Sequence, residues 1–148
     1  MAEQRAAPAP QGITITRMSE HDLLEVVQIE EQSGLSRWGW AAYYAELQGA
    51  NRDLMLVARA AETILELTPI TGYIVARETA GELHINNFAV RSDYRRRGIG
   101  AIMTQRCVDD GWARGCTVSA LQSSSSGYPI YERIGYRHVA DIQGWTFA

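Results

Sequence analysis

The segment Leu83–Ala101 constrains the fold more than any other part of the chain. It begins with β-branched and aromatic residues, which favour a strand, and it ends at Gly98-Ile99-Gly100, where apolar residues begin to recur at helical spacing. Arginines occupy positions 91 and 95–97 between these two parts. Because a helix N-terminus carries unpaired N–H groups and glycine lets a phosphate approach the backbone, the segment predicts an anion site in a strand–turn–helix unit.

The apolar residues of the predicted strand change parity halfway along it. Leu83 and Ile85 occupy odd positions, whereas Phe88 and Val90 occupy even ones. One extra residue at Asn86-Asn87, a β-bulge, would return all four side chains to the same face. The alternative is a strand buried on both faces, for which parity carries little information. We favour the bulge because asparagines occupy the position.

The remaining pattern predicts an α+β domain over residues 12–148, preceded by an Ala/Pro-rich tail, residues 1–11, that we expect to be disordered. The segment Ala61–Thr68 is ambiguous and could extend one or both strands of a hairpin. Further helices are expected from the N-cap Ser19 to near Gly34, at Arg37–Leu47, from Gly100 to Gly115 and from Pro129 to Gly135. Further strands are expected at Ile13–Thr16, Leu54–Ala58, Ile70–Arg77, Cys116–Leu121, Tyr136–Ala140 and Trp145–Phe147.

Composition excludes several classes of function. The net charge of −3 gives no overall field that would attract nucleic acid, so the arginines matter by position. No apolar run approaches the roughly 20 residues of a membrane span. The two cysteines, Cys107 and Cys116, are too few for a disulfide scaffold or a zinc site. The chain has no lysine, which excludes a P-loop and lysine Schiff-base chemistry and indicates a GC-rich bacterial gene. We therefore expect a cytoplasmic protein without metal, nucleic acid or membrane partners.

Two motifs resemble those of the Gcn5-related N-acetyltransferases, the GNAT superfamily. The run from Arg95 to Gly100 fits the pattern (Gln/Arg)-x-x-Gly-x-(Gly/Ala), and it follows a strand that ends in Phe88-Ala89-Val90. The segment Tyr131–Tyr136 is similar to the late Tyr-x-x-x-Gly-(Phe/Tyr) element of that family. The predicted order of elements matches over nearly the whole chain beyond the tail. The resemblance implies a GNAT fold, with a mixed, mostly antiparallel sheet splayed at a β-bulge and flanked by about four helices.

The resemblance also implies direct transfer of an acetyl group from acetyl-CoA to an amine of a small molecule or a peptide. Tyr131 occupies the position of the general acid that protonates the leaving thiolate, although a core tyrosine is the alternative. Ser124 stands where many relatives have an asparagine that touches the cofactor. The implied cofactor-binding residues are Phe88, Ala89, Val90, Arg95, Arg96, Arg97, Gly98, Ile99, Gly100, Ala101 and Ser124.

The sequence does not determine which group is the general base or which amine is the acceptor. His84 is the best titratable candidate for the base, because histidine side chains exchange protons near neutral pH. A surface histidine, or a water relayed through Asn86, Ser119 or a backbone carbonyl, is the alternative. Trp38, Asn86 and Asn87 are expected on the substrate side.

The two ends of the chain resemble relatives that act on different classes of substrate. The part from Glu30 to Leu47 is similar to the protein N-terminal acetyltransferases that act on ribosomal proteins. The loop Ser123–Pro129 is more similar to acetyltransferases of small molecules. A protein N-terminus as acceptor and a non-catalytic acyl-CoA-binding domain are therefore the alternatives, and the sequence leaves room for a homodimer.

Overall fold

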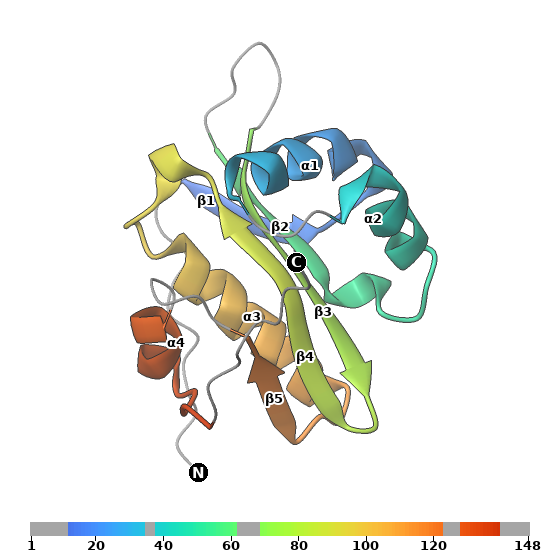
Figure 1. Cartoon of the computed structure of the whole chain (residues 1–148), viewed down its shortest axis with the longest axis vertical. Helices are drawn as coiled ribbons and strands as arrows, with labels where there is room; N and C mark the ends of the chain where they lie inside the picture. The colour runs from blue at the N-terminus through green and yellow to red at the C-terminus, as the bar shows by residue number, and fades with distance from the viewer. Residues whose placement is uncertain (1–11, 35–37, 62–68, 123–127, 140–148) are drawn as a thin grey trace, which may run out of the picture.

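The computed structural model describes residues 12–34, 38–61, 69–122 and 128–139 (Figure 1). The expected tail, residues 62–68 of the ambiguous segment Ala61–Thr68, Ser124 and the closing strand at Trp145–Phe147 lie outside the described residues. The strands are β1 (Ile13–Arg17), β2 (Met55–Ala60), β3 (Ile70–Thr79), β4 (Glu82–Val90) and β5 (Val118–Leu121). The helices are α1 (Leu23–Gln32), α2 (Gly39–Leu47), α3 (Ile99–Ala113) and α4 (Tyr128–Ile134), with single 3-10 turns η1 (Glu20–Asp22), η2 (Arg52–Leu54) and η3 (Ser92–Tyr94).

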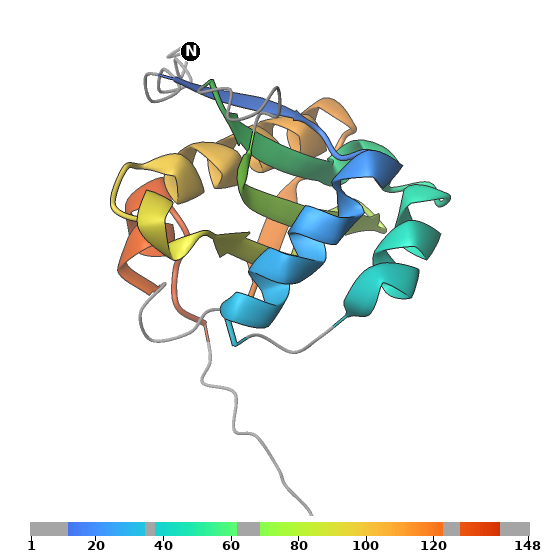
Figure 2. The ribbon, with the colours of Figure 1, turned by 90° about the horizontal axis from the view of Figure 1, so that it is seen from above.

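The five strands form one sheet in the order β1-β2-β3-β4-β5. Neighbouring strands are antiparallel except β4 and β5, which are parallel. Helices α1 and α2 cover one face of the sheet, and α3 covers the other with α4 beside it (Figure 2). The expected mixed, mostly antiparallel sheet with about four helices is therefore confirmed.

The predicted bulge is present in β4. Ile85 pairs with Ala76 and Asn87 pairs with Val75, so Asn86 is the extra residue. Leu83 and Ile85 belong to the core cluster beneath α3, and Phe88 and Val90 pack against the same cluster. The change of parity read from the sequence therefore has the expected cause, since one inserted residue returns all four side chains to one face.

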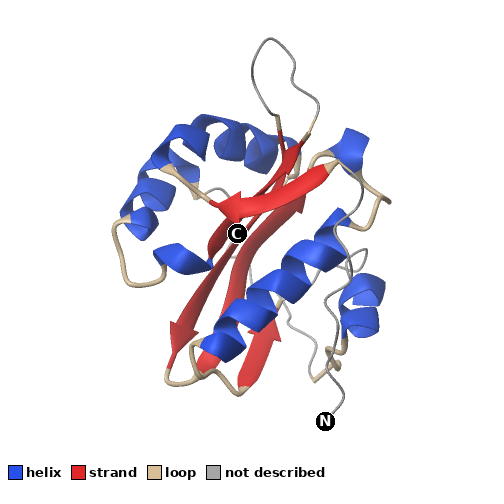
Figure 3. Cartoon of the chain, turned by 180° about the vertical axis from the view of Figure 1, so that it is seen from behind, coloured by secondary structure: helices blue, strands red, loops and turns tan. Residues whose placement is uncertain are grey.

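Strand β5 leaves β4 at this bulge. It pairs only with Glu82–Ile85, and no described strand pairs with the same edge of β4 from Asn86 to Val90. We call Asn86–Val90 the open edge of β4. The view from behind shows the long helix α3 lying across this face of the sheet (Figure 3). The splay that the resemblance implied is thus located at Asn86.

Of two predictions made from local sequence signals near helix ends, one is confirmed and one is wrong. Ser19 forms the expected capping box, since its backbone N–H donates to the Asp22 carboxylate (2.8 Å). The strand expected at Tyr136–Ala140 is wrong for its described part, because residues 136–139 are in no strand. Instead, the backbone N–H of Tyr136 donates to the carbonyl of Tyr131 (3.0 Å) and its hydroxyl is hydrogen-bonded to Ser119. These contacts hold Tyr136 against α4 and β5.

Candidate active site

The turn before α3 has the backbone geometry of an anion site. Arg96 and Gly98 both adopt left-handed conformations, with φ of 64° and 78°. Gly98 is the N-cap of α3, and no side chain among the described residues caps the helix there. The first helical bond recorded across the turn runs from the Ile102 N–H to the Gly98 carbonyl (3.2 Å). The first-turn N–H groups are therefore free to bind an anion, and the helix dipole favours negative charge at this position.

The three arginines of the turn have different surroundings, although all three are exposed. Arg95 Nε donates to the Val90 carbonyl (3.1 Å) and so ties the turn to the end of β4. The Arg97 guanidinium lies over the Tyr94 ring, 5.0 Å from its centroid. Within the described ranges, Arg96 makes no hydrogen bond or ion pair, which leaves its guanidinium available for a ligand.

The start of α3 is packed closely against the open edge. A Cβ atom added at Gly100 would lie 2.9 Å from Cζ of Phe88, closer than ordinary van der Waals contact. The Phe88 ring in turn meets the Tyr131 ring edge-on at 6.2 Å, and Tyr131 meets Tyr136 in the same way at 6.1 Å. A continuous line of contacts therefore joins the anion site to Tyr131.

Tyr131 has the properties of a proton donor. Burial, with a smaller contribution from the neighbouring Tyr136, raises the pKa of Tyr131 to about 12. In the described parts of the chain, its hydroxyl has no hydrogen-bond partner, whereas the hydroxyl of Tyr136 is bonded to Ser119. Tyr131 therefore holds its proton at neutral pH and can offer it to a bound molecule.

The predicted substrate residues come together on the α1–α2 side of the bulge. Asn87 is only 7% exposed, whereas the neighbouring Asn86 is exposed. The Asn87 amide is assigned the orientation in which its nitrogen donates to the Asn86 carbonyl (2.7 Å) and its oxygen accepts from Trp38 Nε1 (3.2 Å), because the opposite orientation faces oxygen with oxygen and nitrogen with nitrogen. The Arg77 guanidinium lies 5.2 Å from the centroid of the Trp38 ring. Asn86, Asn87 and Trp38 thus form one connected group.

No contact between described residues joins His84 to Tyr131. It is on β4 two residues before Asn86, which corresponds to about 6.6 Å of strand. Its side chain is 42% exposed, and its Nε2 is 3.0 Å from the Glu82 carboxylate. The structure therefore places His84 near the bulge but joins it to neither Asn86 nor Tyr131 by a recorded contact.

Sequence reasoning missed the polar residues behind Asn87. The Tyr43 hydroxyl is 2.9 Å from the Asn87 amide and is also bonded to Glu30 and Tyr73. One signal was available, because Glu30 follows Leu23 and Val26 at spacings of seven and four residues, on the buried side of α1. A carboxylate in an apolar stripe indicates a buried polar partner.

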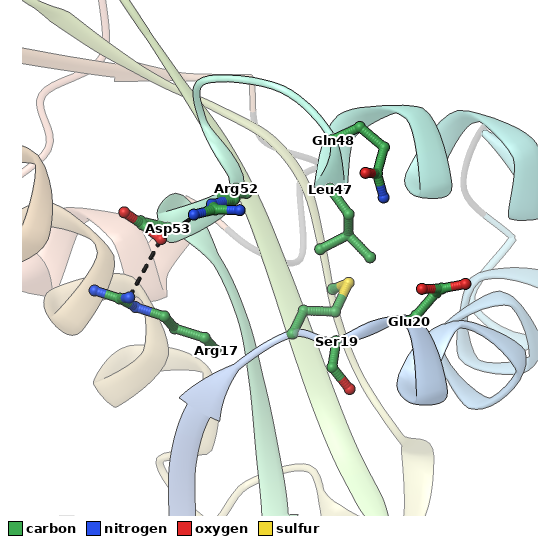
Figure 4. Close-up of a pocket in the computed structure, with 8 residues that line it drawn as sticks. Arg17, Ser19, Glu20, Leu47, Gln48, Arg52 and Asp53 are labelled. Carbon is green, nitrogen blue, oxygen red and sulfur yellow. Dashed lines mark ion pairs between the residues drawn. The ribbon is translucent and has the colours of Figure 1, made fainter.

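A cavity of about 340 Å³ lies elsewhere, at the end of α2 (Figure 4). None of its lining residues belongs to β4, α3 or α4, and Arg17 and Asp53 among them form an ion pair at 3.3 Å. It is therefore separate from the site at the open edge. The lining residues are Arg17, Met18, Ser19, Glu20, Leu47, Gln48, Arg52 and Asp53.

The described residues contain no group of three or more His, Cys, Asp or Glu side chains that could hold a metal ion. In the same ranges, every helix is too short or too polar to cross a membrane.

Comparison with known proteins identifies this arrangement. The acetyltransferase (GNAT) domain family matches residues 51–138, a range that includes β4, the turn and Tyr131. The [ribosomal protein bS18]-alanine N-acetyltransferase of Salmonella typhimurium strain LT2 is 24% identical over 83% of this chain and 80% of its own length.

Solved structures agree with the family match. Ard1 from Thermoplasma volcanium superposes with a TM-score of 0.74 at 20% identity, over 87% of this chain and 85% of its own. The NatC complex bound to Gag peptide and CoA gives a TM-score of 0.76 at 17% identity, over 88% and 87%. Since the family match covers more than half of the chain and its fold agrees, this protein belongs to the GNAT acetyltransferases.

Proposed function

We propose that the protein transfers an acetyl group from acetyl-CoA directly to a primary amine, and that this amine is the N-terminus of a peptide or protein. The observation that carries the proposal is the open edge of β4. It begins where the pairing with β5 ends, after Ile85, and it leads at Val90 to the turn before α3. A peptide acceptor is favoured by the name of the Salmonella relative and by the peptide bound to NatC. The similarity of Glu30–Leu47 to the ribosomal-protein acetyltransferases supports the same choice.

The residues of the turn fit the donor. Acetyl-CoA carries a pyrophosphate, which suits uncapped N–H groups at a helix start and a free guanidinium such as that of Arg96. The backbone N–H and C=O groups of Phe88–Val90 at the open edge have no strand partner among the described residues. They can therefore pair with the amide-containing arm of acetyl-CoA as they would with an added strand. When bound, acetyl-CoA supplies the acetyl group as a thioester.

The chain's own residues would then handle the protons. As the C–N bond forms and the C–S bond breaks, the Tyr131 hydroxyl donates its proton to the leaving sulfur. The amine loses a proton to a base, for which His84 and a water held by Asn86 are the two candidates. Ser119 is a weaker candidate, because its hydroxyl is already bonded to Tyr136.

The raised pKa of Tyr131 predicts the shape of the pH profile. An acid works only while protonated, and a pKa of about 12 keeps Tyr131 protonated throughout the range in which the enzyme can be assayed. We therefore expect kcat to rise or stay level from neutral pH to about pH 10, with no falling alkaline limb. Steady-state rates in overlapping buffers test this. A falling limb with an apparent pKa near the ordinary value of tyrosine would contradict the assignment.

The left-handed turn allows the charge of Arg96 to be removed without disturbing the backbone. Arg96→Gly keeps the positive φ at no steric cost, so we expect acetyl-CoA to bind about three- to tenfold more weakly through loss of a charged phosphate contact alone. Isothermal titration with acetyl-CoA measures this. Arg106→Gln is the matched control, because Arg106 pairs with Asp110 on the exposed side of α3. Equal Kd values for wild type and Arg96→Gly would remove Arg96 from the donor site.

An acceptor panel tests the proposed function directly. The wild-type protein is incubated with acetyl-CoA and three probes: a peptide that begins with alanine, the same peptide with a blocked N-terminus and an internal lysine, and glucosamine. CoA release and product mass are measured. We expect the free N-terminal peptide to be acetylated fastest. Preference for glucosamine would favour a small-molecule acceptor, and binding of acetyl-CoA without any turnover would favour a non-catalytic binding domain.

We also propose that the protein works in the cytoplasm as one domain over residues 12–148. Cys107 and Cys116 are both buried and free, which agrees with a reducing compartment.

A further inference from the structure

A buried carboxylate joins α1 to the start of α2. Glu30 is 1% exposed, and one of its oxygens accepts the backbone N–H groups of Trp38 and Gly39, both at 3.0 Å. Its other oxygen accepts the Tyr43 hydroxyl. Because a buried charge is costly unless it is hydrogen-bonded, these partners determine where the segment entering α2 lies relative to α1. Helices α1 and α2 lie on the same face of the sheet (Figure 2).

Tyr43 is the centre of this group. Its hydroxyl donates its one proton to the Glu30 carboxylate, and the Tyr73 hydroxyl (3.1 Å) and the Asn87 amide (2.9 Å) lie within hydrogen-bond distance of the same oxygen. Burial, followed by the hydrogen bond to Glu30, raises the pKa of Tyr43 far above its usual value. Tyr43 therefore stays a donor at every working pH.

The same contacts continue to the bulge. The Asn87 amide lies 2.9 Å from the Tyr43 hydroxyl oxygen, its own oxygen accepts from Trp38 Nε1, and its nitrogen donates to the Asn86 carbonyl. Helix α1 is thus connected through side chains to the peptide group of the extra residue in β4. Apolar neighbours surround this group, including Val26, Ile29 and Val75. A fully bonded polar group in an apolar core favours one arrangement over its alternatives.

We infer that Glu30 and Tyr43 are positioning residues for acetyl transfer, which hold the Asn86 peptide and the Trp38 ring in place on the acceptor side of the open edge. This inference rests on the proposed function. Neither residue needs to touch the acceptor. Because they orient Asn86 and Trp38, substituting them should lower kcat/KM for the acceptor and leave the affinity for acetyl-CoA unchanged.

Two tyrosine variants separate positioning from general stability. Tyr43→Phe and Tyr73→Phe each remove one buried hydroxyl and keep the ring, but only Tyr43 contacts Glu30 and Asn87. We expect Tyr43→Phe to lower kcat/KM for the alanine-initial peptide by about tenfold to one hundredfold, since small misplacements in an active site have effects of that size. Acetyl-CoA Kd should stay within about twofold in both variants, and Tyr73→Phe should keep kcat/KM within about threefold.

Glu30→Gln and Glu30→Ala provide a second pair if Tyr43→Phe does not fold. Glutamine retains the acceptor for the Trp38 and Gly39 N–H groups, so it should recover most of the kcat/KM that alanine loses. Equal kcat/KM in Tyr43→Phe and Tyr73→Phe, or equal losses in the two Glu30 variants, would overturn the inference.

A readout without turnover keeps this inference distinct from the proposed function. If the wild type acetylates no probe, the proposed function fails and amide hydrogen exchange of the Asn86–Phe88 peptide groups decides the positioning role. We expect exchange there to be about tenfold faster in Tyr43→Phe than in Tyr73→Phe. Equal exchange in the two variants would overturn the inference.

Discussion

Tyr131→Phe is expected to lower kcat for acetyl transfer by a factor of roughly one hundred to ten thousand, the usual contribution of a positioned general acid. The substitution removes the only proton that the side chain can donate to the leaving sulfur. It keeps the ring, which contacts Phe88 and Tyr136 edge-on. Acetyl-CoA Kd should therefore change little, and the loss should appear in kcat. Single-turnover rates with saturating acetyl-CoA measure the effect without a contribution from product release.

Tyr136→Phe is the matched control for Tyr131→Phe. It removes a hydroxyl from the same motif, but that hydroxyl is bonded to Ser119. We expect its kcat to stay within about fivefold of wild type, because it loses one hydrogen bond and no proton donor. If the two variants have the same kcat, Tyr131 is a core tyrosine and the proton must come from elsewhere.

Gly100→Ala is expected to have the second largest effect. The new methyl group would lie 2.9 Å from Phe88 Cζ, and Phe88 is held on its other side by Tyr131. Either the Phe88 ring must then shift, or helix α3 must move away from β4. A shift of the ring displaces Tyr131, and a shift of the helix moves the first-turn N–H groups away from the open edge. We expect kcat/KM to fall by about one hundredfold, with weaker acetyl-CoA binding contributing to it.

Gly111→Ala controls for the loss of stability. Its methyl group would lie 2.8 Å from Leu83 Cδ2, so it meets β4 as closely as the one at Gly100 does. Overpacking of this kind costs about 1–3 kcal/mol, and alanine returns up to about 1 kcal/mol through helix propensity. Thermal unfolding should therefore show similar decreases in Tm. Only Gly100→Ala should weaken acetyl-CoA binding, and equal Kd values in the two variants would contradict the assigned role of the α3 start.

Much of the donor side could be predicted from the sequence, because its signals are local. The turn has glycine at one of its two positions with positive φ, the helix has its apolar spacing, and the bulge appears as a change of parity within eight residues, from Leu83 to Val90. Each depends on backbone conformation over a few neighbouring residues. The two motifs lie within such segments, so the GNAT resemblance followed from them and the family match confirmed it.

The acceptor side and the close packing were decided by tertiary structure. Glu30, Tyr43 and Asn87 come from α1, α2 and β4, and they meet only because both helices dock on the same face of the sheet. The closing strand expected at Tyr136–Ala140 was wrong in its described part for a related reason, since contacts with Tyr131 and Ser119 overrode a local preference for strand.

The sequence by itself thus determined the fold class, the bulge and the glycine-containing turn before α3, which depend on local conformation. Which side chain meets Gly100, and what lies behind Asn87, depended on contacts between residues far apart in the chain. Such contacts are set by how whole elements pack.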